Sequence, residues 1–363
     1  MKNKIILSLI VCALAFTAYS QKIAKPTLTP KLPTTEQSLL IQLGIKLHDA
    51  GKYDQATAKY EEVIALNPDC AQAIYELSMT LYAKGDKEKS METASRGSKY
   101  ISDELPLFYV TMANILDDYG KHKEAIKIYQ DGIKLLEGDK RFAGYKASLY
   151  YNLGVTYTIQ KQYDNAREAL KSAVENNFSY GSPHFLLSYV YNGTKFRIPA
   201  VLAGVRFISL EYNTARSNTT ALTITDVLKP ATKDPKTGNT QINLDFGTPK
   251  DEGDFDSINL LLPMLGVSKD DKDKNKTDEE KFVDSLDTLI GLVASDKKIA
   301  STFVGKNYVP FLVDLKRNGH IQPLGYLILY NAGNNLALKW LQINDAKVKD
   351  LVQWAKAYPS AVK

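Results

Sequence analysis

Histidine and cysteine side chains carry out much of the acid–base, nucleophilic and metal chemistry of proteins, and this chain has few of either. The four histidines are isolated from one another in sequence: His48, His122, His184 and His320. The chain lacks a GxSxG elbow, a glycine-rich phosphate loop, an HExxH pair and cysteine pairs at ligand spacing. General acid–base catalysis needs partners within hydrogen-bond reach, and no local pattern supplies them. The sequence therefore predicts no enzyme, no cofactor and no metal.

One acidic stretch has the residue types of calcium ligands. Asp271, Asp273 and Asn275 have the alternate spacing with which a calcium-binding loop opens. Such a loop needs a glycine where this chain has Lys276, and a bidentate glutamate where it has Phe282. We therefore interpret the stretch as part of a solvated, charged linker and not as a calcium site.

Aromatic residues are the remaining candidates for recognition, because their side chains give a large contact area at low entropic cost. The chain has 22 tyrosines, 12 phenylalanines and 2 tryptophans. What these residues can bind depends on the elements that carry them. Many of the tyrosines belong to a pattern that recurs about every 34 residues, so this pattern decides where they lie.

A period of about 34 residues is typical of helix-turn-helix repeats. The first copy contains, in order, Leu43, Gly44, Leu47, Gly51, Tyr53, Ala56, Tyr60 and Pro68. The small residue at which two helices cross recurs at spacings of 34, 35, 41 and 34, as Gly44, Ser78, Ala113, Gly154 and Ser188. The spacing of 41 indicates an insertion near positions 138–144. Residues 37–211 thereby resemble the tetratricopeptide-repeat family, which implies a mainly α protein with an α-solenoid of about five repeats.

The resemblance also implies that the first helix of each repeat lines the concave face of the superhelix. The positions used on this face are Ile41, Ile45, His48, Tyr75, Met79, Tyr82, Val110, Asn114, Asp117, Tyr151, Val155, Thr158, Phe185, Tyr189 and Asn192. The candidate binding residues among them are Tyr75, Met79, Tyr82, Asn114, Tyr151, Phe185, Tyr189 and Asn192. Their aromatic and apolar character predicts a protein or peptide partner with apolar anchors. Repeats that clamp the C-terminal carboxylate of chaperones also use lysine and arginine at these positions. None of the positions named above has a lysine or an arginine in this chain.

Three other interpretations stay open. The chain's own C-terminal half could fold back and fill the groove. Alternatively, tyrosine and tryptophan side chains could stack on sugars, in a carbohydrate- or nutrient-binding accessory protein of the cell envelope. Some envelope glycan-binding proteins carry tetratricopeptide repeats, although those proteins are longer and lipid-anchored. The third interpretation is a hydrolase hidden in the C-terminal part.

After the last repeat the helical period is lost. We expect residues 212–276 to be a linker that contains a β-hairpin at 222–247 and a charged loop. In this hairpin Gln241–Phe246 alternates polar and apolar residues, and Leu222–Leu228 is the partner strand. A short apolar helix is expected at Ile258–Leu265.

Residues 277–363 are predicted to form a small helical domain. Thr277 and Glu280 form a capping box, which starts a helix of about 18 residues. Further helices are expected at Tyr308–Lys316, Leu324–Asn331, Leu336–Ile343 and Ala346–Ala357. Trp340 and Trp354 are interpreted as anchors of the core.

The first residues have the order of a secretory signal peptide. Lys2 and Lys4 precede an apolar run from Ile5 to Phe16, and Ala18, Tyr19 and Ser20 then precede Gln21. A helix needs about 20 apolar residues to cross a bilayer, so we expect no stable membrane anchor. Residues 1–20 are therefore predicted to be a signal peptide, and the protein is expected in the periplasm or outside the cell.

Removal of the signal peptide lowers the formal net charge from +5 to +3 and leaves Cys70 as the only cysteine. No internal disulfide is then possible. Nucleic-acid binding needs lysine and arginine clustered on one face, and the sequence has no such stripe. We therefore expect no nucleic-acid partner.

Overall fold

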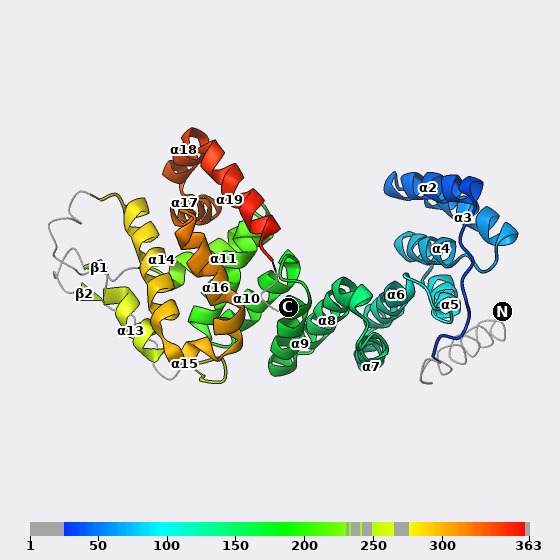
Figure 1. Cartoon of the computed structure of the whole chain (residues 1–363), viewed down its shortest axis with the longest axis horizontal. Helices are drawn as coiled ribbons and strands as arrows, with labels where there is room; N and C mark the ends of the chain where they lie inside the picture. The colour runs from blue at the N-terminus through cyan, green and yellow to red at the C-terminus, as the bar shows by residue number, and fades with distance from the viewer. Residues whose placement is uncertain (1–24, 230–231, 234–239, 242–248, 265–275, 360–363) are drawn as a thin grey trace, which may run out of the picture. The chain divides into compact units, whose positions relative to one another are not determined.

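The structure is a computed structural model that describes residues 25–229, 232–233, 240–241, 249–264 and 276–359. α-Helices make up most of the described residues (Figure 1). The chain divides into two compact units, residues 1–160 and 161–363. This boundary lies inside the repeat array, between the two helices of the fourth repeat.

The first unit is a stack of paired helices that follow one another along the chain (Figure 1). Its elements are α2 (Thr35–Asp49), α3 (Tyr53–Leu66), α4 (Ala71–Lys84), α5 (Lys87–Gly97), α6 (Leu105–Asp118), α7 (His122–Leu135), the 3-10 helix η2 (Lys140–Phe142) and α8 (Ala143–Ile159). Each α-helix packs against the next α-helix in sequence, and α2, α4, α6 and α8 also contact one another in that order. The predicted α-solenoid is confirmed.

Small residues let the two helices of a repeat approach closely, as the sequence spacing predicts. A Cβ atom at Gly44 would lie 2.5 Å from the ring of Tyr60, which is fully buried between α2 and α3. Ser78 is fully buried at the equivalent position of the second repeat. The turn between the helices needs a left-handed residue, which is Gly51 with φ of 72° in the first repeat and Lys161 with φ of 58° in the fourth.

The second unit combines the end of the repeat array with the C-terminal helices. Its elements are α9 (Tyr163–Asn176), α10 (Gly181–Gly193), α11 (Arg197–Leu210), α12 (Ala215–Val227), β1 (Thr232–Lys233), β2 (Thr240–Gln241), α13 (Asp256–Met264), α14 (Asp278–Ser295), α15 (Lys297–Ala300), α16 (Phe303–Arg317), α17 (Ile321–Asn331), α18 (Asn335–Ile343) and α19 (Asp345–Ala357). The helix α11 contacts α10, α12, α16, α17 and α19, and its residues 198–209 are all buried. The fifth repeat therefore shares its core with the C-terminal helices.

The prediction of a strand at Leu222–Leu228 is wrong, because this segment forms the second half of α12 and its C-cap. Thr214 caps the helix, since its hydroxyl accepts a hydrogen bond from the N–H of Ser217 and the Ser217 hydroxyl accepts one from the N–H of Thr214. The buried residues Ala221 and Ile224 lie one helical turn apart. They belong to the face of α12 that is buried, and α12 packs on α11 and α17.

The two short strands that follow form a different hairpin. β1 and β2 pair antiparallel, with Thr232 opposite Gln241 and Lys233 opposite Thr240. Of the predicted strand Gln241–Phe246, only Gln241 lies among the described residues. The three oxygen-bearing residues of the calcium-like stretch, at 271, 273 and 275, lie outside them as well.

The helices predicted in the C-terminal part are confirmed with small differences in length. The Thr277 hydroxyl accepts a hydrogen bond from the N–H of Glu280 at 3.2 Å, and the Glu280 carboxylate accepts one from the N–H of Thr277 at 2.9 Å. Trp340 stacks on Tyr326 with ring centroids 4.2 Å apart. Trp354 stacks on Phe311 at 5.3 Å. Both tryptophans thus pack against other aromatic side chains of the chain, but both are only half-buried and lie at the edge of the core.

Candidate functional site

The first helices of successive repeats form a continuous layer in the first unit, because α2, α4, α6 and α8 contact one another. This layer carries the candidate residues Tyr75 and Met79 on α4, Asn114 on α6 and Tyr151 on α8, all of them half-buried. Half-burial leaves part of each side chain exposed while packing fixes its position. The structure therefore brings these four residues onto neighbouring helices, whereas Ile41 is buried in the core of the first two repeats.

Tyr75 is held by aromatic packing. Its ring meets the ring of Phe108 edge-on, with centroids 5.8 Å apart. Burial, together with the nearby Glu76 carboxylate, raises the pKa of Tyr75 to about 12. The Tyr75 hydroxyl is consequently protonated at neutral pH and able to donate a hydrogen bond.

Hydrogen bonds within the chain orient two of the candidates, Tyr82 and Asn114. The Tyr82 hydroxyl donates to Asp118 Oδ2 at 2.8 Å, which connects α4 with α6. The Tyr129 hydroxyl donates to Asn114 Oδ1 at 2.5 Å, which connects α7 with α6. Tyr82 and Asn114 therefore contribute to the shape of the face, and their polar atoms also join neighbouring helices.

Asp117 on α6 connects this helix with α7 and α8. Its carboxylate accepts a hydrogen bond from the Thr156 hydroxyl on α8, and its Oδ1 atom lies 3.0 Å from Nδ1 of His122 on α7. Another candidate position of the face, His48, places Nδ1 2.8 Å from the Thr80 hydroxyl. These polar contacts hold the helices of the layer in register, so the histidines act as structural groups here.

An acidic side chain beside Tyr75 was not among the predicted site residues. Glu76 is half-buried on α4, and burial together with the carboxylates of Glu104 and Asp49 raises its pKa. Among the described residues, no side chain forms a hydrogen bond or an ion pair with Glu76. Because Glu76 is not one of the groove positions of the family, its only signal in the sequence is its place next to Tyr75.

In the second unit, the candidate residues Phe185, Tyr189 and Asn192 lie on α10. Tyr189 is 58% exposed, Asn192 is exposed, and Phe185 is half-buried with its ring 5.3 Å from the ring of Phe207. The C-terminal helices pack mainly on α11 and α12. Within the fifth repeat, Arg216 of α12 lies over the Phe185 ring at 5.3 Å, whereas Tyr189 and Asn192 remain exposed.

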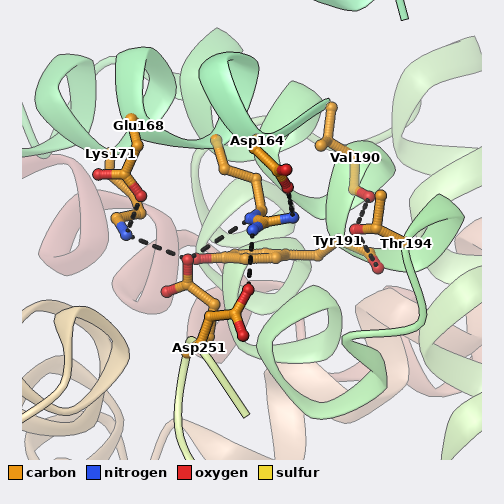
Figure 2. A network of polar contacts seen from close by, with 9 residues as sticks. Asp164, Glu168, Lys171, Val190, Tyr191, Thr194 and Asp251 are labelled. Atoms are coloured by element: carbon orange, nitrogen blue, oxygen red, sulfur yellow. Dashed lines mark hydrogen bonds and ion pairs between the residues drawn. The ribbon is translucent and has the colours of Figure 1, made fainter. Parts of the chain in front are cut away.

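A second polar cluster anchors the segment before α13 to α9 (Figure 2). Glu252 is only 2% exposed, and its Oε1 atom lies 3.1 Å from Lys171 Nζ and 3.6 Å from Arg167 Nε. Arg167 also forms ion pairs with Asp164 at 2.9 Å and with Asp251 at 3.4 Å. At this end of the charged stretch, the carboxylates of Asp251 and Glu252 are therefore not freely solvated but compensate two cations of the fourth repeat.

The Arg167 guanidinium is confined on a second side by an aromatic ring. Its Cζ atom lies 4.5 Å from the centroid of the Phe196 ring. A cavity of about 520 Å³ adjoins this group and is lined by Lys161, Gln162, Tyr163, Asp164, Asn165, Arg167, Thr194, Phe196, Pro249 and Asp251. Because carboxylates already neutralise Arg167, the cluster is a structural anchor.

A third group of polar atoms is fully enclosed between the fifth repeat and the C-terminal helices. His184 Nε2 lies 2.9 Å from the carbonyl oxygen of Phe178, and Nδ1 lies 2.9 Å from the Tyr308 hydroxyl. Since a carbonyl only accepts, Nε2 carries the proton and Nδ1 accepts from Tyr308. Burial and the nearby Arg206 lower the pKa of His184 to about 3. A neutral histidine without solvent access is structural and not catalytic.

Arg206 completes this buried group. Its Nη1 atom donates to the carbonyl oxygen of Ala355 at 2.8 Å, and its Nη2 atom donates to that of Phe178 at 3.1 Å. The guanidinium lies between the rings of Phe178 and Phe311, at 4.5 and 4.6 Å from their centroids. Burial lowers the pKa of Arg206 to about 9. Arg206 therefore connects the end of α9, α11, α16 and the end of α19.

Two features of other protein classes are absent from the described part of the chain. No group of three or more histidine, cysteine, aspartate or glutamate side chains is placed to hold a metal ion there. None of the described helices has the length and apolar character needed to cross a bilayer.

Comparison with known proteins identifies the repeat and several relatives. Models of the tetratricopeptide repeat match residues 47–115 and 147–180. The chain is 25% identical over 331 residues to BBSome complex member BBS4 of Bos taurus, an alignment that covers 85% of this chain and 56% of that protein. It is 32% identical over 111 residues to the Mus musculus protein of the same name, covering 30% and 19%. The chain thus spans 56% of the length of the Bos taurus protein and 19% of the length of the Mus musculus protein.

Solved structures with a similar arrangement of helices are also known. One is described as a functional characterization of Pseudomonas aeruginosa pilF, with a TM-score of 0.46 and 16% identity over 53% of this chain and 83% of that one. Another is a thermophilic tetratricopeptide-repeat protein of Thermus thermophilus, with a TM-score of 0.42 and 16% identity over 52% and 98%.

Proposed function

Because the chain is a tetratricopeptide-repeat protein, we propose that it is a non-catalytic scaffold that binds a segment of another protein on the inner face of its repeats. Tetratricopeptide repeats indicate protein partners in general. The proposal adds the place of binding, namely the layer formed by α4, α6 and α8. It also adds the chemical character of the partner.

The observation that carries the proposal is the row of half-buried aromatic and apolar side chains on this layer. Tyr75, Met79 and Tyr151 come from two helices of the layer and keep part of their surface exposed. Partly buried tyrosines lose little side-chain entropy on binding, because packing already restricts them. Such residues are enriched at the energetic centres of protein interfaces.

The charges beside these residues select among partners. Glu76 is half-buried, and no described side chain compensates it. An approaching lysine or arginine would gain a charge-assisted hydrogen bond there and would relieve the repulsion from Glu104 and Asp49. The segment that best suits this face therefore has apolar anchors and at least one basic residue.

The named relatives agree with a role in assembly. The relative that covers 85% of this chain is named as a member of a complex, the BBSome. Membership of a multiprotein complex is what a scaffold of this kind is expected to have. The chain spans only part of that relative, so the particular complex is not carried over to this protein.

We place the scaffold outside the cytoplasm, in the periplasm or the extracellular space. This part of the proposal depends on the signal-peptide pattern of residues 1–20 alone. N-terminal sequencing of the protein recovered from cell fractions tests it. We expect a mature chain that begins near Gln21 in the exported fraction, and an intact Met1 in the cytoplasm would overturn the export.

Binding of a sugar is a less suitable role for the aromatic residues of this chain. The tryptophan rings would be the best stacking platforms, but Trp340 already stacks on Tyr326 and Trp354 on Phe311. The carbohydrate-binding interpretation therefore has no observation of its own in its favour.

The proposal is tested by photo-crosslinking in cells. A photoreactive amino acid is placed at Met79 on the inner face and, as a control, at the exposed Glu92 on α5. We expect one protein to be trapped at Met79 and not at Glu92, and identified by mass spectrometry. Identical products at both positions would contradict binding on the inner face.

A further inference from the structure

The helix α2 exposes a face that is covered in every other repeat. Leu39 is 60% exposed and Leu43 is 45% exposed, whereas the equivalent Ala73 and Leu77 of the second repeat are 0% and 9% exposed. The equivalent residues of the later repeats are also buried: Phe108, Met112, Leu149, Leu153, Pro183 and Leu187. In those repeats the second helix of the preceding repeat covers the face, as α3 covers α4. The first repeat has no preceding helix among the described residues.

The described segment before α2 runs elsewhere. The N–H groups of Thr27 and Leu28 donate to the carbonyl oxygen of Lys99, each at 3.0 Å. Further along, the N–H of Lys31 donates to the carbonyl oxygen of Asp69 at 2.9 Å. These bonds hold the segment against the ends of the first two repeats. The apolar face of α2 is thus left for another occupant.

The exposed face continues beyond its two leucines. Glu36, Leu39, Leu43 and Lys46 are all exposed and lie at i, i+3, i+7 and i+10, which places them along one stripe of the helix. An acidic residue therefore stands at the N-terminal end of the stripe and a basic residue at its C-terminal end. At the equivalent of Lys46, the later repeats have buried residues: Thr80, Ile115, Thr156 and Val190.

This stripe is complementary to itself. If two copies of α2 cross antiparallel about a two-fold axis near position 41, Leu39 of each copy faces Leu43 of the other. The same rotation brings Glu36 of each copy opposite Lys46 of the other. Because of the two-fold axis, the leucine contact and the charge pair each occur twice in the dimer.

We propose that a second copy of this chain covers the stripe, so that the protein forms a two-fold symmetric dimer through α2. A head-to-tail stack of repeats from successive copies does not fit, because α11, the second helix of the last repeat, is already covered by α12 of the same chain. The dimer does not depend on what the inner face binds, so an experiment that contradicts one proposal leaves the other unaffected.

The dimer should be weak and depend on concentration. The helix has 15 residues and is about 22 Å long, so the contact is smaller than a standard stable interface. We expect dissociation in the micromolar range. Sedimentation equilibrium of the purified chain over a hundredfold range of concentration measures it directly.

The decisive variants change the stripe only. Leu43→Asp is expected to raise the dissociation constant at least tenfold, and the control Leu66→Asp, at an exposed leucine of α3 outside the stripe, leaves it unchanged. Glu36→Lys and Lys46→Glu each weaken the dimer through like charges, and the double variant restores it. The double variant still carries the unfavourable charge that Glu36→Lys introduces at the N-terminus of α2. If the double variant dimerises, the single variants were weakened by the lost charge pair and not by a defect in folding.

Three results would overturn the dimer. The first is a wild-type chain that stays monomeric at every concentration. The second is a dimer that Leu43→Asp does not weaken. The third is a double charge variant that associates no better than either single variant, which would exclude the antiparallel pairing.

Discussion

His184 and Tyr308 form a hydrogen bond of 2.9 Å across 124 positions of sequence, and both side chains are fully buried. The bond joins α10 of the fifth repeat to α16 of the C-terminal helices. His184 completes the contact by donating from Nε2 to the carbonyl oxygen of Phe178. The end of the repeat array and the C-terminal helices are therefore expected to unfold together.

Removal of the Tyr308 hydroxyl tests this connection. In Tyr308→Phe the Nδ1 atom of His184 has no donor, and a buried acceptor without a partner costs about 1–3 kcal/mol. We expect the free energy of unfolding of the second unit to fall by this amount in urea titrations. The control is Tyr212→Phe at a tyrosine that is 39% exposed, for which no loss is expected. Equal stability of both variants would show that the bond is unimportant.

The same histidine predicts a dependence of stability on pH. The pKa of His184 is lowered from 6.5 to about 3 in the folded chain. Below pH 6.5 the unfolded chain binds a proton that the folded chain does not bind, so acid destabilises the fold. The loss is about 1.4 kcal/mol per pH unit between pH 6.5 and 3.

Carboxylates titrate in part of this range, so the measurement is a difference between wild type and His184→Gln. Between pH 6.5 and 4.5 the wild type should lose about 2–3 kcal/mol more unfolding free energy than the variant. Urea unfolding at three pH values in this interval provides the comparison. Parallel pH profiles would contradict the burial of a neutral imidazole at this site.

Glu252 is predicted to be the anchor of the segment before α13. Glu252→Gln leaves Arg167 and Lys171 without their shared buried carboxylate, and breaking a buried ion pair costs about 3–5 kcal/mol. Hydrogen exchange of residues 249–262 should become faster in this variant. Asp254→Asn, which removes the more exposed ion pair with Lys250, serves as the control and should leave the stability nearly unchanged.

Close packing of the first repeat is tested at Gly44. In Gly44→Ala the new Cβ atom meets the buried Tyr60 ring at 2.5 Å, so the ring must move within a packed core. Overpacking of this kind costs about 1–3 kcal/mol, measured as a lower free energy of unfolding. Gly144 in the first turn of α8 has no other atom within 4 Å of such a Cβ atom, and Gly144→Ala should be neutral or slightly stabilising.

The repeats were predictable because their signal is local and periodic. Gly44 and its equivalents mark each helix crossing, and a capping box such as that of Thr277 marks a helix start within four residues of sequence. The error at Leu222–Leu228 has a local cause as well. Threonine is frequent in this segment and favours strands, whereas the cap at Thr214 uses Ser217 in place of the usual glutamate or glutamine.

The polar clusters were not predictable, because their partners are distant in sequence. Glu252 belongs to a charged run that resembles a solvated loop, and only the fold places it beside Arg167, 85 positions earlier. The same holds for His184 and Tyr308. Groove positions such as Tyr75 and Tyr151 were obtained from the family pattern, and the structure adds Glu76, which that pattern does not include.

The central claim is that the inner face of the repeats binds a protein segment with apolar anchors. The most direct measurement is isothermal titration of the trapped partner against the wild type, the double variant Tyr75→Ala/Tyr151→Ala, and Glu92→Ala. We expect the double variant to weaken binding at least tenfold and Glu92→Ala to leave the affinity unchanged. Equal affinities of the wild type and the double variant, with the fold intact by circular dichroism, would contradict the claim.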